Sequence, residues 1–268
     1  MLRVIRSEFI KLGRRGSLIA TVAATAAITV LGTAIPYLTN GTGGGGPFGG
    51  GSSQGSTSAD AASTGAAALE VADGAFSGLA DVSKLLGAVA LVVAALAVAN
   101  EYAHGTLKNL LVRQPNRLTL LGGKLTAIGL YVAALGALAA TVAIPVSYAF
   151  AATHDVSTDT WALTEVFSAA GELVASNLVY AAIGGTLAVL LRSSSTAIGL
   201  GVGWALLGEQ LIGSLVDIDT SLPGQLATGL TGGSEAMSTS GLLTGLAIWI
   251  AGLTTVALVA FHRREVTS

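Results

Sequence analysis

Apolar residues gather along the chain in runs long enough to cross a lipid bilayer. A helix needs about 20 mostly apolar residues to span about 30 Å of hydrocarbon. Such runs predict membrane-spanning helices over residues 17–38, 85–100, 118–152, 166–191, 196–216 and 242–261. The second run is short, and residues 76–84 are expected to extend it outward, whereas the third can tilt or bend near Pro145. The pattern therefore predicts an all-α integral membrane protein with six spans in a single domain over residues 1–268.

The composition supports the membrane class. Hydrophobic residues make up 52% of the chain and charged residues only 10%, whereas soluble domains carry about 25% charged residues. A soluble domain with a large core would still need a charged surface, and whole runs of this chain carry no charge. The sequence has no cysteine, so it offers no disulfide framework and no thiolate metal site.

Charges are distributed unevenly on the two sides of the predicted spans. Of the 13 Lys and Arg residues, all but Lys84 fall on one side, and among the acidic residues only Glu8, Glu101 and Glu265 lie there. The positive-inside rule places this side, with both termini, in the cytoplasm. The alternative of a cleaved secretory signal at the amino terminus is rejected, because the apolar run continues to Pro36 without a clear cleavage site.

Residues 1–16 carry an apolar stripe at helical spacing. Leu2, Ile5, Phe9 and Leu12 form the stripe, and the opposite face is basic, with Arg3, Arg6, Lys11 and Arg14. This pattern predicts an amphipathic helix that lies in the membrane interface. A basic flank that merely orients the first span would explain the charges but not the stripe.

Two long connectors are predicted to lie outside. Residues 40–84 begin as a Gly-, Ser- and Thr-rich stretch with little to bury, which predicts an external loop. From Ala66 the composition turns to Ala, Leu and Val with spaced acids, as in an amphipathic helix that leads into the second span. Residues 217–241 form the second external segment.

Residues 101–117, between the second and third spans, carry a second amphipathic pattern. Leu107, Leu110 and Leu111 share one helical face, cationic residues flank it, and Pro115 closes the helix. An ordinary solvated loop would not need a leucine face, and an exposed apolar stripe is usually covered by a partner or by lipid. The pattern therefore predicts a short cytoplasmic docking helix.

Here the chain resembles the type-2 ABC transporter permease family. The resemblance rests on Glu101-Tyr102, Gly105-Thr106, the Leu110-Leu111 pair, Pro115, Arg117 and Gly123-Lys124-Leu125. It also rests on the order of parts along the whole chain, from the interfacial helix through the external loop and the cytoplasmic helix to the closing segment at residues 261–266. The long Gly-rich stretch departs from the compact external loops of many members.

The resemblance implies partners and roles. In that family the interfacial helix and the helix between spans two and three contact a separate ATPase. The resemblance thus implies an ABC ATPase in two copies, with ATP and Mg bound by that partner and no cofactor in this chain, and a second permease copy or paralogue beside it. A bacterial plasma membrane is the expected location, with membrane lipid around the spans. The residues expected to dock the ATPase are Glu101, Tyr102, Gly105, Thr106, Leu107, Lys108, Leu110, Leu111 and Arg113, with Arg3, Arg6, Phe9 and Lys11 in the interfacial helix.

The chain lacks the motifs of an enzyme. A phosphate-binding loop fails at its only candidate, because Gly123-Lys124 is followed by Leu125 and the first glycine position holds Leu118. The three histidines are widely separated and form no metal-ligand spacing. We therefore expect no catalysis, no metal site and no nucleic-acid partner for this chain.

Polar residues within predicted spans are costly and often functional. Glu209, Gln210 and Asn177 are candidates for a substrate pathway or for a cation or proton site. The competing interpretation for Glu209 is that water or a partner amide reaches it. Glu172 is placed near the outer boundary, where a functional role is not needed.

The leading hypothesis is the membrane subunit of an ATP-driven exporter that forms the substrate pathway as a dimer. An ion-coupled secondary transporter is the first alternative, motivated by Glu209 and Glu172, although such carriers commonly show internal repeats and none is visible here. A non-transporting membrane scaffold or immunity component is the second.

Overall fold

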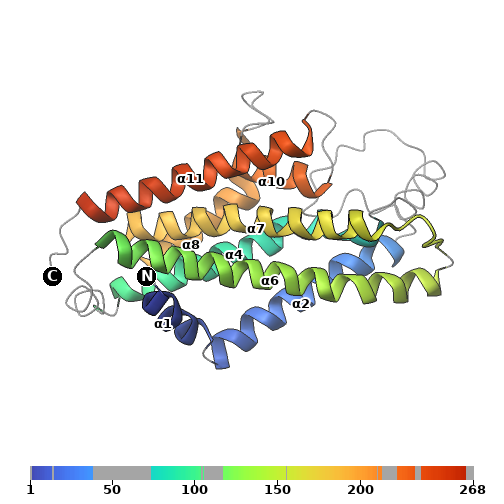
Figure 1. The fold of residues 1–268 in the computed structure, drawn as a ribbon, viewed down its shortest axis with the longest axis horizontal. Coiled ribbons are helices and arrows are strands. Elements are labelled where there is room, and N and C mark those ends of the chain that lie inside the picture. Colours follow the sequence, from blue (N-terminus) through green and yellow to red (C-terminus); the bar gives the residue numbers. More distant parts are fainter. Residues whose placement is uncertain are drawn as a thin grey trace.

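The computed structural model is a bundle of helices (Figure 1). It describes residues 2–13, 15–38, 74–103, 105, 117–154, 156–209, 211–212, 222–232 and 237–263, and all regular structure in these ranges is helical. The all-α class is therefore confirmed for these residues. The elements are α1 (Leu2–Leu12), α2 (Arg15–Leu38), η1 (Gly74–Phe76), α4 (Ser77–Ala103), α6 (Arg117–Thr153), α7 (Leu163–Leu191), α8 (Ser194–Gly203), the π-helical η2 (Trp204–Gly208), α10 (Pro223–Gly232) and α11 (Thr239–Arg263).

Five of the described helices are long and apolar enough to cross a membrane, namely Arg15–Leu38, Val82–Ala103, Leu118–Thr153, Leu163–Leu191 and Thr239–Arg263. The shortest has 22 residues, which makes it about 33 Å long and sufficient for the hydrocarbon layer. The run predicted as a span over residues 196–216 contains a shorter apolar helix, Ser194–Gly208. The sixth crossing therefore stays a prediction.

The centre of the bundle is formed by α4 and α7, which are the most buried of these helices and contact each other most extensively. Small residues allow their close approach. Gly184 of α7 lies against the backbone of Leu91, and Gly87 of α4 lies against the ring of Tyr180. A Cβ atom at either glycine would overlap its neighbour, which is the usual reason for small residues where membrane helices meet.

The outward faces of α2 and α11 remain apolar. Ile19 and Leu31 of α2 and Ile248 and Val259 of α11 are exposed. In water such a surface would be unfavourable, whereas hydrocarbon accepts it, so these faces suit contact with lipid.

The second long helix includes the outward extension that the sequence predicts over residues 76–84. α4 starts at Ser77, so residues 77–84 continue the helix of the apolar run 85–100 and are not part of the external loop assigned to 40–84. Leu79 and Val82 are buried, and Gly78 lies against Gly32 of α2. Packing against α2 therefore extends the helix beyond the strongly apolar run, whereas residues 39–73 lie outside the described ranges.

A short helix, α10, lies within the predicted external segment 217–241. Pro223 is its first residue, a position that suits proline because the first amides of a helix have no partner within the helix. Leu226, Ala227 and Leu230 are buried, and α10 packs against α7, α11 and α4. The segment therefore contains a helix packed into the bundle and is more than an external loop. The sequence does not reveal this helix, because its ten residues are too few to show a helical period.

One end of the bundle gathers α1 with the ends of several long helices (Figure 1). Leu12 of α1 belongs to the same buried apolar cluster as Val98 of α4, Leu121 of α6 and Phe261 of α11. We refer to this region as the α1 end. It contains α1, the last turns of α4 and α11, and the first turns of α6.

Candidate functional site

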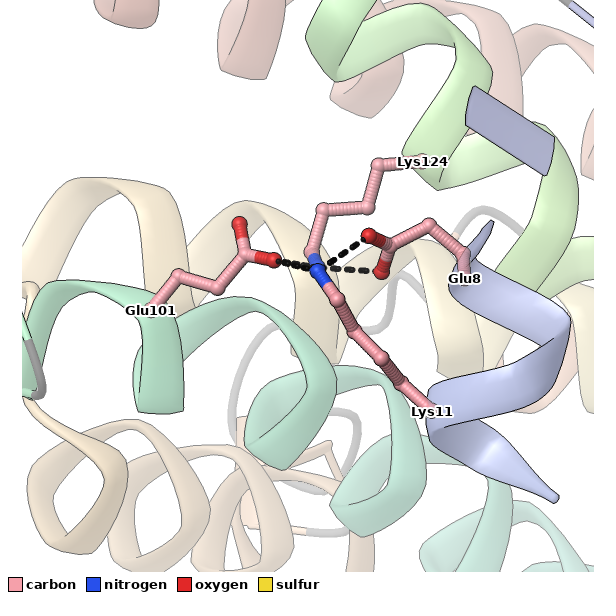
Figure 2. Close-up of polar contacts among 4 residues, drawn as sticks. All are labelled: Glu8, Lys11, Glu101 and Lys124. Atoms are coloured by element: carbon pink, nitrogen blue, oxygen red, sulfur yellow. Dashed lines mark hydrogen bonds and ion pairs between the residues drawn. The ribbon is translucent and has the colours of Figure 1, made fainter. Parts of the chain in front are cut away.

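Four charged side chains meet at the α1 end. Figure 2 shows Glu8 and Lys11 of α1, Glu101 of α4 and Lys124 of α6 pointing toward one another. Lys11 Nζ lies 2.7 Å from Glu8 Oε1 and 2.8 Å from Glu101 Oε1. Lys124 Nζ lies 2.7 Å from Glu8 Oε2 and 2.9 Å from Glu101 Oε1. Each ammonium group therefore contacts both carboxylates, and we refer to these four residues as the charge cluster.

The helices place these side chains by simple periodicity. Glu8 and Lys11 are three residues apart in α1 and so share one face, which is turned toward the bundle. Ile10, between them in sequence, is 69% exposed and lies on the outer face with Phe9. Glu101 lies in the last turn of α4, and Lys124 lies near the beginning of α6. The cluster thus joins three helices that are separate in sequence.

Most of the cluster is removed from solvent. Glu8 and Lys124 are each 4% exposed and Glu101 is 8% exposed, whereas the Lys11 side chain keeps 43% of its surface. A buried charge is unfavourable unless an opposite charge and good hydrogen bonds compensate for its lost hydration. Two carboxylates and two ammonium groups satisfy this requirement together, so loss of one member leaves another insufficiently compensated.

Two of the four charged residues of α1, Glu8 and Lys11, titrate away from their ordinary range. Burial by itself raises the pKa of Glu8, but the ammonium groups of Lys124 and Lys11 outweigh it and hold this pKa below its ordinary value of 4.5. Burial lowers the pKa of Lys11, but hydrogen bonds to Glu101 and Glu8 outweigh it and raise this pKa above 10.5. The ionised forms are therefore favoured over a wide range around neutral pH.

A second contact ties α4 to α7 at this end. The guanidinium carbon of Arg192 lies 5.9 Å from the centre of the Tyr102 ring, a distance that allows a cation–π interaction. Arg192 ends α7 in the left-handed conformation with φ 54°, and its N–H donates to the carbonyl of Ala188. The ends of α4 and α7 are thus linked directly, beside the charge cluster.

Three of the predicted ATPase-docking residues lie in the described ranges. Glu101 is buried in the charge cluster, Tyr102 is half-buried beside Arg192, and Gly105 is exposed. Gly105 has φ +62°, which glycine adopts without strain, and its N–H donates to the carbonyl of Tyr102. The other predicted docking residues, Thr106, Leu107, Lys108, Leu110, Leu111 and Arg113, lie outside the described ranges.

The predicted interfacial residues belong to α1. Phe9 is 38% exposed on its outer face, and Lys11 points into the charge cluster. Arg3 and Arg6 also lie in this helix, but the positions of their side chains are not described.

The predicted pathway residues do not form a single group. Asn177 of α7 is 4% exposed, faces Gly136 of α6, and its Oδ1 has no hydrogen-bond partner within the described structure. Glu209 is also 4% exposed but contacts Trp204 and the first turn of α10. Gln210 lies outside the described ranges.

The sequence did not single out Glu8 and Lys124 as site residues. The available signal was that each departs from its surroundings, because Glu8 is acidic within a basic segment and Lys124 is charged at the head of an apolar run. A buried ion pair between distant segments produces this pattern, but the partners are visible only in three dimensions. No group of three or more His, Cys, Asp or Glu side chains that could hold a metal ion occurs among the residues that the structure covers.

Comparison with known proteins identifies the family. A family model described as "ABC-2 family transporter protein" matches residues 2–208, which include α1 and the whole charge cluster. No curated protein matches the chain. No nucleotide-binding domain is evident in the sequence, and the family suggests the membrane subunit of an ABC transporter. The chain therefore belongs to the ABC-2 transporter family, as a multi-pass membrane protein.

Proposed function

We propose that this chain is the membrane subunit of an ATP-driven exporter whose separate ATPase docks on the α1 end. Two copies of the chain, or one copy and a paralogue, would face each other with one ATPase beneath each, and ATP and Mg would bind to the ATPase. The α1 end would face the cytoplasm together with both termini, as the distribution of Lys and Arg favours. Family membership and the charge cluster support this proposal.

The charge cluster is the observation that carries the proposal. Glu101 lies just before residues 104–116 and Lys124 lies just after them, and both bind Glu8 or Lys11 of α1. An ATPase that pushes on this connector would therefore act on α1, α4 and α6 together, because the ion pairs resist their separation. Under this proposal Glu101 acts by fixing the connector in place, and Gly105 with the leucine face of residues 107–111 meets the ATPase.

The sixth membrane span is part of the same proposal. Residues 196–216 would complete a sixth span that begins with α8 and η2, and the pathway would run between two copies of the chain. Asn177 stays a pathway candidate for a ligand that enters between α6 and α7, because a buried amide oxygen without a partner is costly.

Co-purification from native cells tests the proposal. The detergent-solubilised chain should bring down an ATP-binding protein in stoichiometric amount, with ATPase activity in the complex. Thr106→Glu combined with Leu110→Glu should abolish this association, because charges would replace the apolar docking face. Ser240→Glu, on an exposed position at the beginning of α11, is the matched control and should leave it intact. Recovery of the chain without any ATPase would contradict the proposal and favour an ion-coupled carrier.

A further inference from the structure

Away from the charge cluster, Glu209 occupies a buried polar site at the junction of η2 and α10. Its Oε1 accepts a hydrogen bond from Trp204 Nε1 at 3.0 Å and another from the backbone N–H of Gly224 at 3.1 Å. The backbone N–H of Gln225 also donates to this carboxylate. All three donors are therefore directed at a single side chain that is 4% exposed.

The π-helical turn explains why Trp204 and Glu209 meet. Residues five apart lie on different faces of an α-helix, whereas a π turn bonds residue i to residue i+5 and brings them close to one face. The N–H of Glu209 donates to the carbonyl of Trp204, which closes this turn. The wider turn thus aligns the indole N–H with the carboxylate, and such turns occur frequently at functional sites.

The first turn of α10 supplies the other donors. The first N–H groups of a helix have no partner within the helix, and the positive end of the helix dipole favours a carboxylate there. Pro223 has no N–H, so the open donors of the first turn begin at Gly224 and Gln225. Glu209 serves these two donors from outside α10, in place of a side chain just before the helix.

The surroundings hold the carboxylate close to α10. A Cβ on Gly224 would overlap Glu209 Oε2 and would lie 2.9 Å from Tyr180 Oη, so glycine is required for this approach. Tyr180 is fully buried and faces the same glycine as Glu209, and its hydroxyl has no hydrogen-bond partner within the described part of the chain. Lys84 of α4 is the nearby positive charge that interacts with Glu209. The site thus gathers hydrogen-bond donors from η2 and α10 around one carboxylate, with the positive charge of Lys84 nearby.

The depth of the site in the bundle adds to its significance. Tyr180 lies far from both ends of α7, at about 25 Å from the beginning of that helix. The N-terminus of α10 is therefore held inside the bundle and not at its surface, and an uncompensated helix N-terminus at this depth would be unfavourable.

We propose that Glu209 is a positioning residue that caps α10 from η2 and clamps this helix inside the bundle, so that release of the carboxylate frees α10 to leave. The clamp is a property of this chain alone and does not depend on the proposed ATPase. Under this proposal Glu209 keeps α10 in place, and it does not line a substrate pathway or bind a cation.

Cysteine reactivity tests the clamp cleanly, because the chain contains no native cysteine. Ala227 of α10 is 0% exposed, so Ala227→Cys should react slowly with N-ethylmaleimide in membranes. Adding Glu209→Ala should raise the reaction rate at least tenfold, and sodium formate should restore slow reaction by supplying a carboxylate to the vacated donors. Formamide is about the same size as formate but carries no charge, so it should not restore slow reaction. Glu165→Ala, which removes an exposed carboxylate from α7, is the control and should have no effect.

A milder variant covers the case in which Glu209→Ala fails to insert. Trp204→Phe keeps the apolar ring but removes one donor, and it should raise the rate by a smaller factor. The proposal is overturned if both variants react at the rate of Ala227→Cys alone. It is also overturned if formate and formamide protect Glu209→Ala equally, because the carboxylate would then fill space and not cap the helix.

Discussion

The two lysines of the charge cluster are predicted to differ in their contribution to the docking of α1. The Lys124 side chain is only 6% exposed, and removal of one partner of a buried ion pair costs about 3–5 kcal/mol. Lys11 remains near both carboxylates, so Lys124→Met should cost about 3 kcal/mol, the lower end of that range. The Lys11 side chain is 43% exposed, and pairs open to solvent contribute about 0–1 kcal/mol. Lys11→Met should therefore cost at most about 1 kcal/mol.

The docking of α1 can be followed by a cysteine on its buried face. Leu12 is 8% exposed against the bundle, so Leu12→Cys reacts with a maleimide only when α1 opens. A cost of about 3 kcal/mol should increase the open population, and with it the reaction rate, about a hundredfold. Ile10→Cys, at a position that is 69% exposed, gives the ceiling rate of an open site.

A double substitution separates the ion pair from general damage. Glu8→Gln with Lys124→Met removes both charges, so it should cost less than the sum of the single changes, with a coupling energy of about 1–3 kcal/mol. Equal effects of Lys11→Met and Lys124→Met would refute this reasoning, because burial would then not determine the cost. Additive effects in the double variant would refute it equally.

Three further predictions follow from the same contacts. Because the pKa of Glu8 is lowered and that of Lys11 is raised, cluster stability should be fully present between about pH 4.5 and 10.5. This stability should be lost as pH falls through the lowered pKa of Glu8 or rises through the raised pKa of Lys11. The measurement is the maleimide reaction rate of Leu12→Cys relative to that of Ile10→Cys at each pH. Tyr102→Leu removes a cation–π contact with the end of α7 and should destabilise this end by about 0.5–1 kcal/mol, measured by the same assay. Gly184→Ala would place a Cβ on the backbone of α4 and should abolish monodisperse protein on size exclusion, whereas Gly122→Ala, in open space, should not.

Hydropathy predicted the long helices because the bilayer imposes a strict condition on them. Every backbone polar group in hydrocarbon must be bonded internally, so apolar runs of sufficient length become helices whatever their neighbours. The predicted span over residues 118–152 and the helix Arg117–Thr153 illustrate this. Hydropathy locates the first residue of a helix less accurately where packing against a neighbouring helix determines it. The outward extension over residues 76–84 was expected, but the packing of α4 against α2 that buries Val82 there is not readable from the run itself.

The candidate sites could be predicted only in part. Glu209 stood out in the sequence because a carboxylate within a membrane span is unfavourable. Its partners could not be predicted, because they are the indole of Trp204, five residues away, and the backbone N–H of Gly224, 15 residues away. The π turn that joins them depends on one extra residue in a turn, and no hydrophobic period reveals it. In the charge cluster, Glu8 and Lys124 are 116 residues apart, and charge counting assigned both to one side without pairing them.

The arrangement of the charge cluster also explains how α1, although short, is held in a fixed orientation on the bundle. Eleven residues form too few hydrogen bonds to make an independently stable helix in water, so α1 depends on what it touches. Leu12 supplies an apolar contact, and the ion pairs supply orientation because Glu8 binds Lys124 of α6 and Lys11 binds Glu101 of α4. A rotation of α1 about its axis would break both bonds at once, whereas a rotation of the whole α1 end keeps them. Motion imposed on residues 104–116 is therefore expected to move α1 as a rigid part of the bundle. Substitution of Lys124 should consequently weaken the attachment of α1 to α6.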